Sequence, residues 1–139
     1  MVMAFEERIL WDDVKGEAVT TIYGLLMCYV LADYKITFKD HCKDRVKQRH
    51  ISYDEILNTL RHGKLIEVHF LGNRCTVLLR KQRHNKAEDL IVVFNPVIGQ
   101  VISVYINASN DNHDTLREEL YNKDLDVQKR LEQCIKNSR

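Results

Sequence analysis

The segment LIEVHFLGNRCTVLLRKQ, residues 65–82, joins two apolar runs through a Gly-Asn turn and sets the fold class. Two more runs follow, LIVVF at 90–94 and GQVISVYIN at 99–107, with turn residues between them. Runs rich in Val, Ile, Leu and Tyr that are bounded by turn residues are typical of β-strands. Because the connections are short, consecutive strands must pair antiparallel. The sequence therefore predicts a four-stranded antiparallel sheet over residues 64–107.

Alternation along the last run assigns its side chains to the two faces of the sheet, because successive side chains of a strand point in opposite directions. One face is expected to carry Val101, Ser103, Tyr105 and Asn107. The other face is expected to carry Ile102, Val104 and Ile106.

Two helices are predicted directly before the sheet. The first covers residues 39–49, where an apolar residue recurs every fourth position, at Phe38, Cys42 and Val46. The second begins at a capping box, in which Ser52 is followed three residues later by Glu55. Its core face consists of Ile56, Leu57 and Leu60, and Gly63 falls just past its end.

Further helices are expected at both ends of the chain. A broad apolar face predicts a helix over 12–32, capped by Asp12 or Asp13. One or two helices are expected in the tail, beginning at Asp111 or Asp114. The tail carries an amphipathic stripe at Val127, Leu131, Cys134 and Ile135.

Helices followed by a run of strands indicate an α+β fold. The 139 residues suit one domain, 1–139, in which helices pack on a four-stranded antiparallel sheet. We expect its core at 34–108, where 34–38 form a short strand or an extended entry. The remaining parts are a helical extension at 1–33 and a helical tail at 109–139.

The composition, 45% hydrophobic and 29% charged, is that of a soluble globular protein. The apolar run at 22–32 is too short for a bilayer, which needs about 20 apolar residues, so no membrane partner is expected. The N-terminus lacks the features of a secretory signal, and four scattered cysteines suit free thiols in a reducing cytoplasm. We therefore expect a cytoplasmic protein without a cofactor, whose terminal helices bury their apolar faces in the domain or in a homodimer.

A net charge of +1 conceals an uneven distribution. Residues 1–34 carry −4, residues 35–86 carry +8 and residues 87–139 carry −3, and the middle segment holds five of the six histidines. A basic segment of this kind favours binding to phosphate, of which nucleic acid is the commonest polymeric source. The alternative is a solvated basic face that the acidic ends neutralise.

His41, Arg45 and Arg49 follow one another at intervals of four residues and form a basic stripe along the helix predicted at 39–49. Neighbouring cations repel each other unless an anion lies over them, and Arg binds phosphate through two parallel N–H donors. His titrates near neutral pH and can transfer a proton. The alternative is that Asp40, Asp44 and Asp54 neutralise the stripe in solvent. The His and Cys residues fall at no metal-ligand spacing, so no metal site is expected.

A second basic cluster, Arg80, Lys81 and Arg83 with His84, lies at the end of the second strand. Alternation sends Arg80 and Lys81 to opposite faces, so only one of the two can join a site with the basic stripe. The alternative is a hairpin end whose charge keeps a sheet edge soluble.

A third candidate cluster lies in YINASNDNHDTL, residues 105–116, which contains Tyr105, Asn107 and His113. Polar groups at strand ends and in loops are frequent site residues. The alternative is that these residues supply only turns and helix caps.

The pattern H-x-x-x-R-x-x-x-R-x-I-S, from His41 to Ser52, resembles a small domain family related to the BrnT-type toxins and, more distantly, to the RelE/ParE superfamily. In such domains the motif helix leads into a second short helix that ends near a glycine, and an antiparallel sheet follows. Residues 34–108 match that order. The resemblance implies a RelE/BrnT-like fold and, among its known activities, metal-independent RNA cleavage.

The first function that we expect is accordingly an RNA endonuclease of the toxin type, cutting by attack of the substrate's 2′-hydroxyl. Its catalytic groups would be His41, Arg45, Lys81, His113 and Tyr105, and its phosphate-binding and orienting groups Arg49, Arg80, Arg83 and Asn107. RNA would be the substrate, and an antitoxin or immunity protein a partner. The alternative is a non-catalytic module of a mobile element or phage that binds nucleic acid or protein, in an inhibitor or immunity role.

Overall fold

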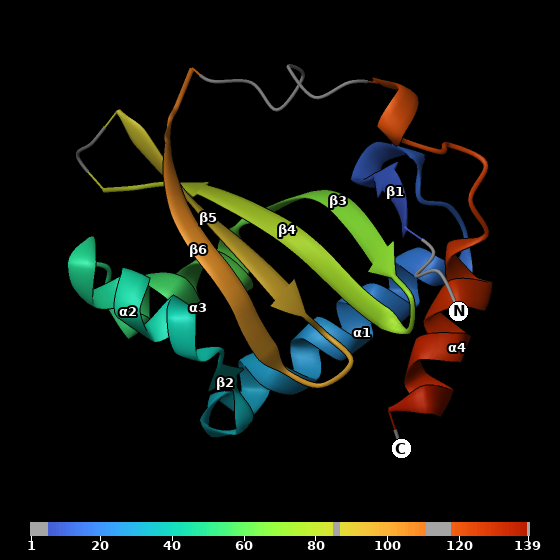
Figure 1. Cartoon of the computed structure of the whole chain (residues 1–139), viewed down its shortest axis with the longest axis horizontal. Coiled ribbons are helices and arrows are strands. Elements are labelled where there is room, and N and C mark those ends of the chain that lie inside the picture. The colour runs from blue at the N-terminus through green and yellow to red at the C-terminus, as the bar shows by residue number, and fades with distance from the viewer. Residues whose placement is uncertain (1–5, 85–86, 111–117, 139) are drawn as a thin grey trace.

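The computed structural model describes residues 6–84, 87–110 and 118–138 (Figure 1). Within them, six strands form one sheet, in which β2 pairs with β6 in parallel and every other pair is antiparallel. Across the sheet the order is β1 (Glu6–Leu10), β3 (Lys64–Leu71), β4 (Arg74–Gln82), β5 (Glu88–Asn95), β6 (Gln100–Ala108) and β2 (Thr37–Phe38). The predicted meander is therefore confirmed, as the central four strands of a wider sheet.

Four α-helices accompany the sheet within the described residues: α1 (Glu17–Leu31), α2 (Asp40–Gln48), α3 (Tyr53–His62) and α4 (Val127–Asn137). Short 3-10 turns lie at η1 (Trp11–Asp13), η2 (Asp33–Lys35) and η4 (Glu118–Leu120). All four helices contribute side chains to one core with the same sheet face, among them Ile22, Val46, Ile56 and Leu131. The α+β prediction is confirmed, and the helices leave the opposite face of the sheet to another set of side chains.

One of the two strands added to the meander was not anticipated. β1 lies in the segment that we expected to be only helical; it pairs antiparallel with β3 and buries Ile9. β2 is the short strand allowed at 34–38, and it adds to the far edge through Thr37 N–H and Lys39 N–H, which donate to the carbonyls of Gly99 and Val101. The sheet therefore has six strands rather than four, because β1 and β2, which both precede α2 in the sequence, form its two edges.

The first long helix begins later than predicted. Asp12 and Asp13 lie in η1 rather than at a helix cap, and α1 starts at Glu17. Gly16 occupies the N-cap with a φ of 65°, a conformation that suits glycine because it lacks a Cβ. The prediction placed the boundary too early because Val14, which is buried, continued the apolar pattern across the turn.

The two helices before the sheet are confirmed. α2 buries Cys42 and Val46 in the core. At the start of α3, Ser52 Oγ accepts a hydrogen bond from the Glu55 N–H at 3.1 Å. Gly63 follows the last helical residue as expected.

A β-bulge changes the predicted faces of β6. Val93 pairs with Ser103 and Phe94 with Val101, so Ile102 is an extra residue on β6. Alternation restarts after the bulge, and Val101 therefore lies in the core with Val104 instead of sharing the face of Ser103 and Tyr105.

α4 is capped by Asp126, whose carboxylate accepts from the Lys129 N–H, and it buries Val127, Leu131 and Cys134. The caps that we proposed at Asp111 and Asp114 lie outside the described residues. All four cysteines are free thiols, as predicted. In the part of the chain that the structure describes, no helix has the length and apolar character needed to cross a bilayer.

Candidate functional site

The basic stripe lies on the outer side of α2. His41, Arg45 and Arg49 are exposed, since Cys42 and Val46 take the face that packs on the sheet. Among the described residues, their side chains make no hydrogen bond or ion pair, and the nearby Asp40 pairs with Lys43 at 3.8 Å instead. The aspartates therefore do not neutralise the stripe by direct pairing, and its charge is available to a ligand.

In the second basic cluster, the two arginines form separate ion pairs with other parts of the fold. Arg80 Nε lies 2.5 Å from the Asp89 carboxylate, and its Nη2 donates to the carbonyl of Ala108. Arg83 lies at the other side of the strand end, with a side chain only 9% exposed, and donates to both carboxylate oxygens of Glu55, at 2.8 and 3.2 Å. These contacts hold β4 to β5 and to α3, so both guanidiniums are already occupied.

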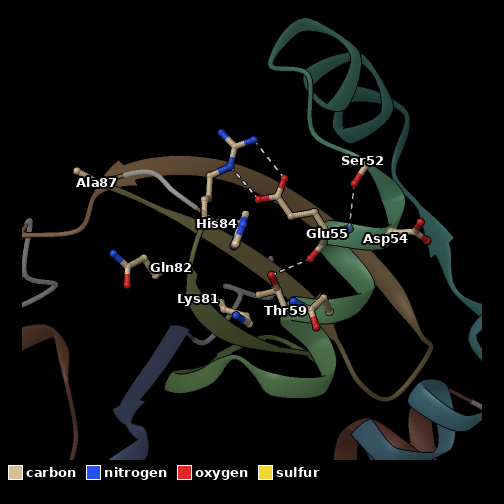
Figure 2. Close-up of a pocket in the computed structure, with 10 residues that line it drawn as sticks. Ser52, Asp54, Glu55, Thr59, Lys81, Gln82, His84 and Ala87 are labelled. Carbon is tan, nitrogen blue, oxygen red and sulfur yellow. Dashed lines mark hydrogen bonds and ion pairs between the residues drawn. The ribbon is translucent and has the colours of Figure 1, made fainter.

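Lys81 lines an open hollow of about 970 Å³ between α3 and the end of β4 (Figure 2). Of the two residues that alternation sends to opposite faces, it is therefore the one on the helical side. Figure 2 shows Glu55 and Ser52 on its α3 side, with Gln82 and His84 across from them. The hollow has Asp54 and Glu55 as well as basic groups, so its charge is mixed. Its lining contains none of the three residues of the basic stripe, which places Lys81 beside α3 rather than α2.

The described part of the third cluster lies on the other side of the sheet from the basic stripe. Tyr105 and Asn107 lie on the sheet face opposite the helices, where they pair in register with Ile91 and Asp89 of β5. His113 lies outside the described residues.

Tyr105 belongs to a second hollow, of about 270 Å³, on that opposite face. Its polar lining comes from Arg8 on β1, Glu67 and His69 on β3, and Thr76 on β4, and its apolar lining is formed by Leu78 and Val93. Strand pairing brings these residues together, since Arg8 is opposite His69 and His69 is opposite Thr76. We call this set the strand-face cluster.

Arg8 is the central cation of the strand-face cluster. Its Nη2 lies 3.0 Å from Glu6, and its Nη1 lies 3.9 Å from Glu67, a carboxylate that is only 5% exposed. Glu67 also accepts a hydrogen bond from the Tyr121 hydroxyl at 3.3 Å. The Arg8 hydrogen bond and charge lower the pKa of Glu6, and these carboxylates in turn keep the Arg8 pKa raised, so the guanidinium is permanently charged.

His69 is a half-buried imidazole that contacts Glu6. Its Nε2 lies 3.1 Å from Glu6 Oε1, an acceptor, so Nε2 carries the proton of the neutral ring and Nδ1 is left with a lone pair. Burial, followed by the charge of Arg8, lowers the pKa of His69 below its ordinary value of 6.5, which favours the neutral ring at pH 7.

The two tyrosines near the hollow remain protonated. Burial and the charge of Glu67 raise the pKa of Tyr105, and the same causes with a hydrogen bond to Glu67 raise that of Tyr121 to about 12. The hollow thus combines a neutral imidazole, a fixed guanidinium and a protonated phenol. Among the described residues no group of His, Cys, Asp and Glu side chains is arranged to hold a metal ion.

Sequence reasoning found Tyr105 but missed Arg8, Glu67 and His69. The signal for the last two was present: Glu67 and His69 are two residues apart in LIEVHF, so they share one strand face. Arg8 had no such signal, because it reaches the hollow only through the pairing of β1 with β3.

The architecture defines the class: an α+β protein whose sheet carries a cavity with titratable groups on the face away from its helices. The family model described as a domain of unknown function, DUF4258, matches residues 38–116, more than half of the chain, and the chain belongs to that family. The match begins in β2 and includes α2, α3 and the four-stranded meander, but not β1, α1 or α4. No curated protein and no solved structure matches the chain.

Proposed function

We propose that this protein is a metal-independent RNA endonuclease of the toxin type, with a RelE/BrnT-like fold, and that the strand-face cluster is its reaction site. The observation that carries the proposal is one cavity that joins Arg8, His69 and Tyr105, in the charge states that such a reaction needs. A cavity of about 270 Å³ is just below the roughly 300–1,000 Å³ of most ligand sites, so we propose that it takes one phosphodiester with its sugar rather than a longer segment of RNA.

The reaction is a transesterification within the substrate. His69 Nδ1 takes the proton of the 2′-hydroxyl, and the 2′-oxygen attacks phosphorus. The P–O5′ bond then breaks as Tyr105 Oη gives its proton to the departing 5′-oxygen. Arg8 stabilises the charge that accumulates on the phosphoryl oxygens, and the products are a 2′,3′-cyclic phosphate and a 5′-hydroxyl.

The carboxylates act on the protein rather than on RNA. Glu6 fixes the ring of His69 and Glu67 holds Arg8, so each cation or base is oriented before substrate binds. The basic stripe on α2 supplies a separate electrostatic attraction for the phosphate backbone, because its charges are exposed and unpaired within the described residues. In this proposal His41, Arg45 and Arg49 bind RNA and do not react with it.

A second candidate function is favoured by the basic stripe alone. If the strand-face cluster is only a structural network, the exposed cations of α2 suit a module that binds nucleic acid or an acidic protein without chemistry. Such a module fits an inhibitor or immunity role in a phage or mobile element.

The experiment is incubation of purified protein with RNA in EDTA, followed by analysis of the fragment ends. We expect cleavage that persists without metal, leaves 2′,3′-cyclic phosphate ends, and stops when the nucleotide at the cut site is 2′-deoxy. Binding of both substrates without cleavage of either supports the second function and overturns the first.

A further inference from the structure

Helix α1 has two apolar faces, of which the domain covers one. Ala18, Ile22 and Leu26 are buried in the core. On the other side Tyr23, Met27 and Leu31 recur every fourth residue and are 51%, 52% and 79% exposed, and Tyr34 in η2 is 82% exposed. We call these four residues the α1 stripe.

No charged side chain interrupts the part of this surface that lies on α1, and Asp33, between Leu31 and Tyr34, pairs with Arg61 at 3.4 Å. Residues 18–32 are fifteen consecutive uncharged residues, although only three side chains of α1 are buried. Large exposed apolar side chains that lie together in a row are typical of an interaction surface rather than of a solvated helix, which alternates apolar and charged faces. Tyr23 is fixed in place by an edge-to-face contact with Trp11, with ring centroids 5.4 Å apart, so the stripe is preorganised at one end.

The charges at the two ends of the stripe are opposite. Glu17 begins α1, and Lys35 ends η2 just beyond its last turn. A twofold axis pairs residue i of one copy with residue j of the other, and j with i. An antiparallel pair of α1 helices therefore places Glu17 of each copy toward Lys35 of the other, and aligns the helix dipoles favourably.

We infer that α1 is the contact surface of a homodimer, in which two copies pack their α1 stripes antiparallel about Met27. Gly24 lies on the exposed side of the helix with nothing within 4 Å of the position of a Cβ, which leaves room for the side chains of the partner subunit. A single helix pair buries less than the roughly 800 Å² per partner of a standard interface, so we expect a reversible dimer.

The first test is the molar mass in solution across a concentration series that extends well above micromolar, by light scattering. The wild type should approach twice the 16.4 kDa of one chain. Met27→Glu and, independently, Leu31→Glu should remain monomeric with unchanged circular dichroism, because both side chains are exposed. Leu120→Glu is the matched control, since Leu120 is 48% exposed on η4, outside the stripe, and it should still dimerise.

The position of the contact along α1 has its own readout. Pairing about Met27 brings the two Cys28 residues within about 3 Å of each other along the helix axes. Cys28 is the exposed thiol and the other three are buried, so a short bismaleimide should link wild-type dimers and fail with Cys28→Ser. A wild type that stays monomeric, a dimer that survives both glutamate variants, or a dimer that Cys28 cannot link would each overturn the inference. None of these outcomes depends on RNA cleavage.

Discussion

Arg8 lies between two carboxylates and beside an imidazole, so the charge state of each neighbour depends on it. Glu6 is exposed and Glu67 is buried, yet both are near the same guanidinium. A buried carboxylate is costly unless a cation and hydrogen bonds compensate it. At the residue scale, the strand-face cluster is therefore a coupled network in which removing one charge changes the pKa of His69.

The two neighbours of His69 should shift its pKa in opposite directions. Burial and Arg8 lower it, whereas the charge and hydrogen bond of Glu6 raise it. NMR titration of the ring should give a value below 6.5 in the wild type, a higher value in Arg8→Gln, and a lower value in Glu6→Gln. Shifts of the same sign in the two variants would contradict this arrangement.

The same shift has a consequence for stability. Because the folded-state pKa lies below the unfolded value, the unfolded chain binds more protons in acid. The contribution of His69 to folding is complete above pH 6.5 and is lost as the pH falls through the folded-state pKa. In urea denaturation, the free energy of unfolding of His69→Gln should accordingly fall less than that of the wild type between neutral pH and pH 5.

Arg83 should be needed for the fold, because its guanidinium is nearly buried against Glu55. Glu55→Gln keeps the shape and removes the charge, and we expect it to reduce the free energy of unfolding by about 1–2 kcal/mol. Asp54→Asn, one residue away and exposed, is the control and should change stability little. Equal effects of the two variants in urea denaturation would contradict a structural role for Arg83.

At the scale of elements, the sequence was most informative where one face is apolar over several residues. β3 to β6, α2 and α3 were predicted because burial selects Val, Ile and Leu at regular intervals and Ser52 supplies a cap. β1 was missed because EERIL has three charged residues in five, and Ile9 alone is fully buried. A strand of this kind is specified by its partner, not by its own pattern.

The bulge on β6 is another feature that the strand's own sequence pattern does not predict. A single extra residue at Ile102 reverses which side chains of the preceding residues face the core, and no turn or glycine marks it in the sequence. Tyr105 and Asn107 lie after the bulge and keep the predicted shared face, while Val101 lies before it and does not.

The terminal elements should be required for folding of the central part of the chain, residues 34–108. Ile9, Ala18, Ile22, Val127 and Leu131 share one core with the sheet, although they lie outside residues 34–108. A fragment of residues 34–108 should therefore be poorly dispersed in NMR spectra and lack a cooperative melting transition, measured beside the full chain. A well-folded monomeric fragment would show that these ends are dispensable.

At the scale of the molecule, the two faces of the sheet are expected to have different tasks. The helical face builds the core and presents the basic stripe from α2, and the opposite face carries the strand-face cluster. Of that cluster, Glu67, His69 and Tyr105 were within reach of strand alternation. Arg8 was not, because it is far from these residues in sequence and comes beside His69 only when β1 pairs with β3.

The measurement that tests the central claim most directly is a comparison of RNA cleavage rates under single-turnover conditions in EDTA for His69→Gln and His41→Ala. We expect His69→Gln to lower the rate roughly 10²–10⁴-fold, the usual contribution of a general base, with RNA binding retained. His41→Ala should weaken binding and leave the rate at saturating protein nearly unchanged. A wild-type rate in His69→Gln, together with loss of the chemical step in His41→Ala, would contradict the account and place the reaction on α2.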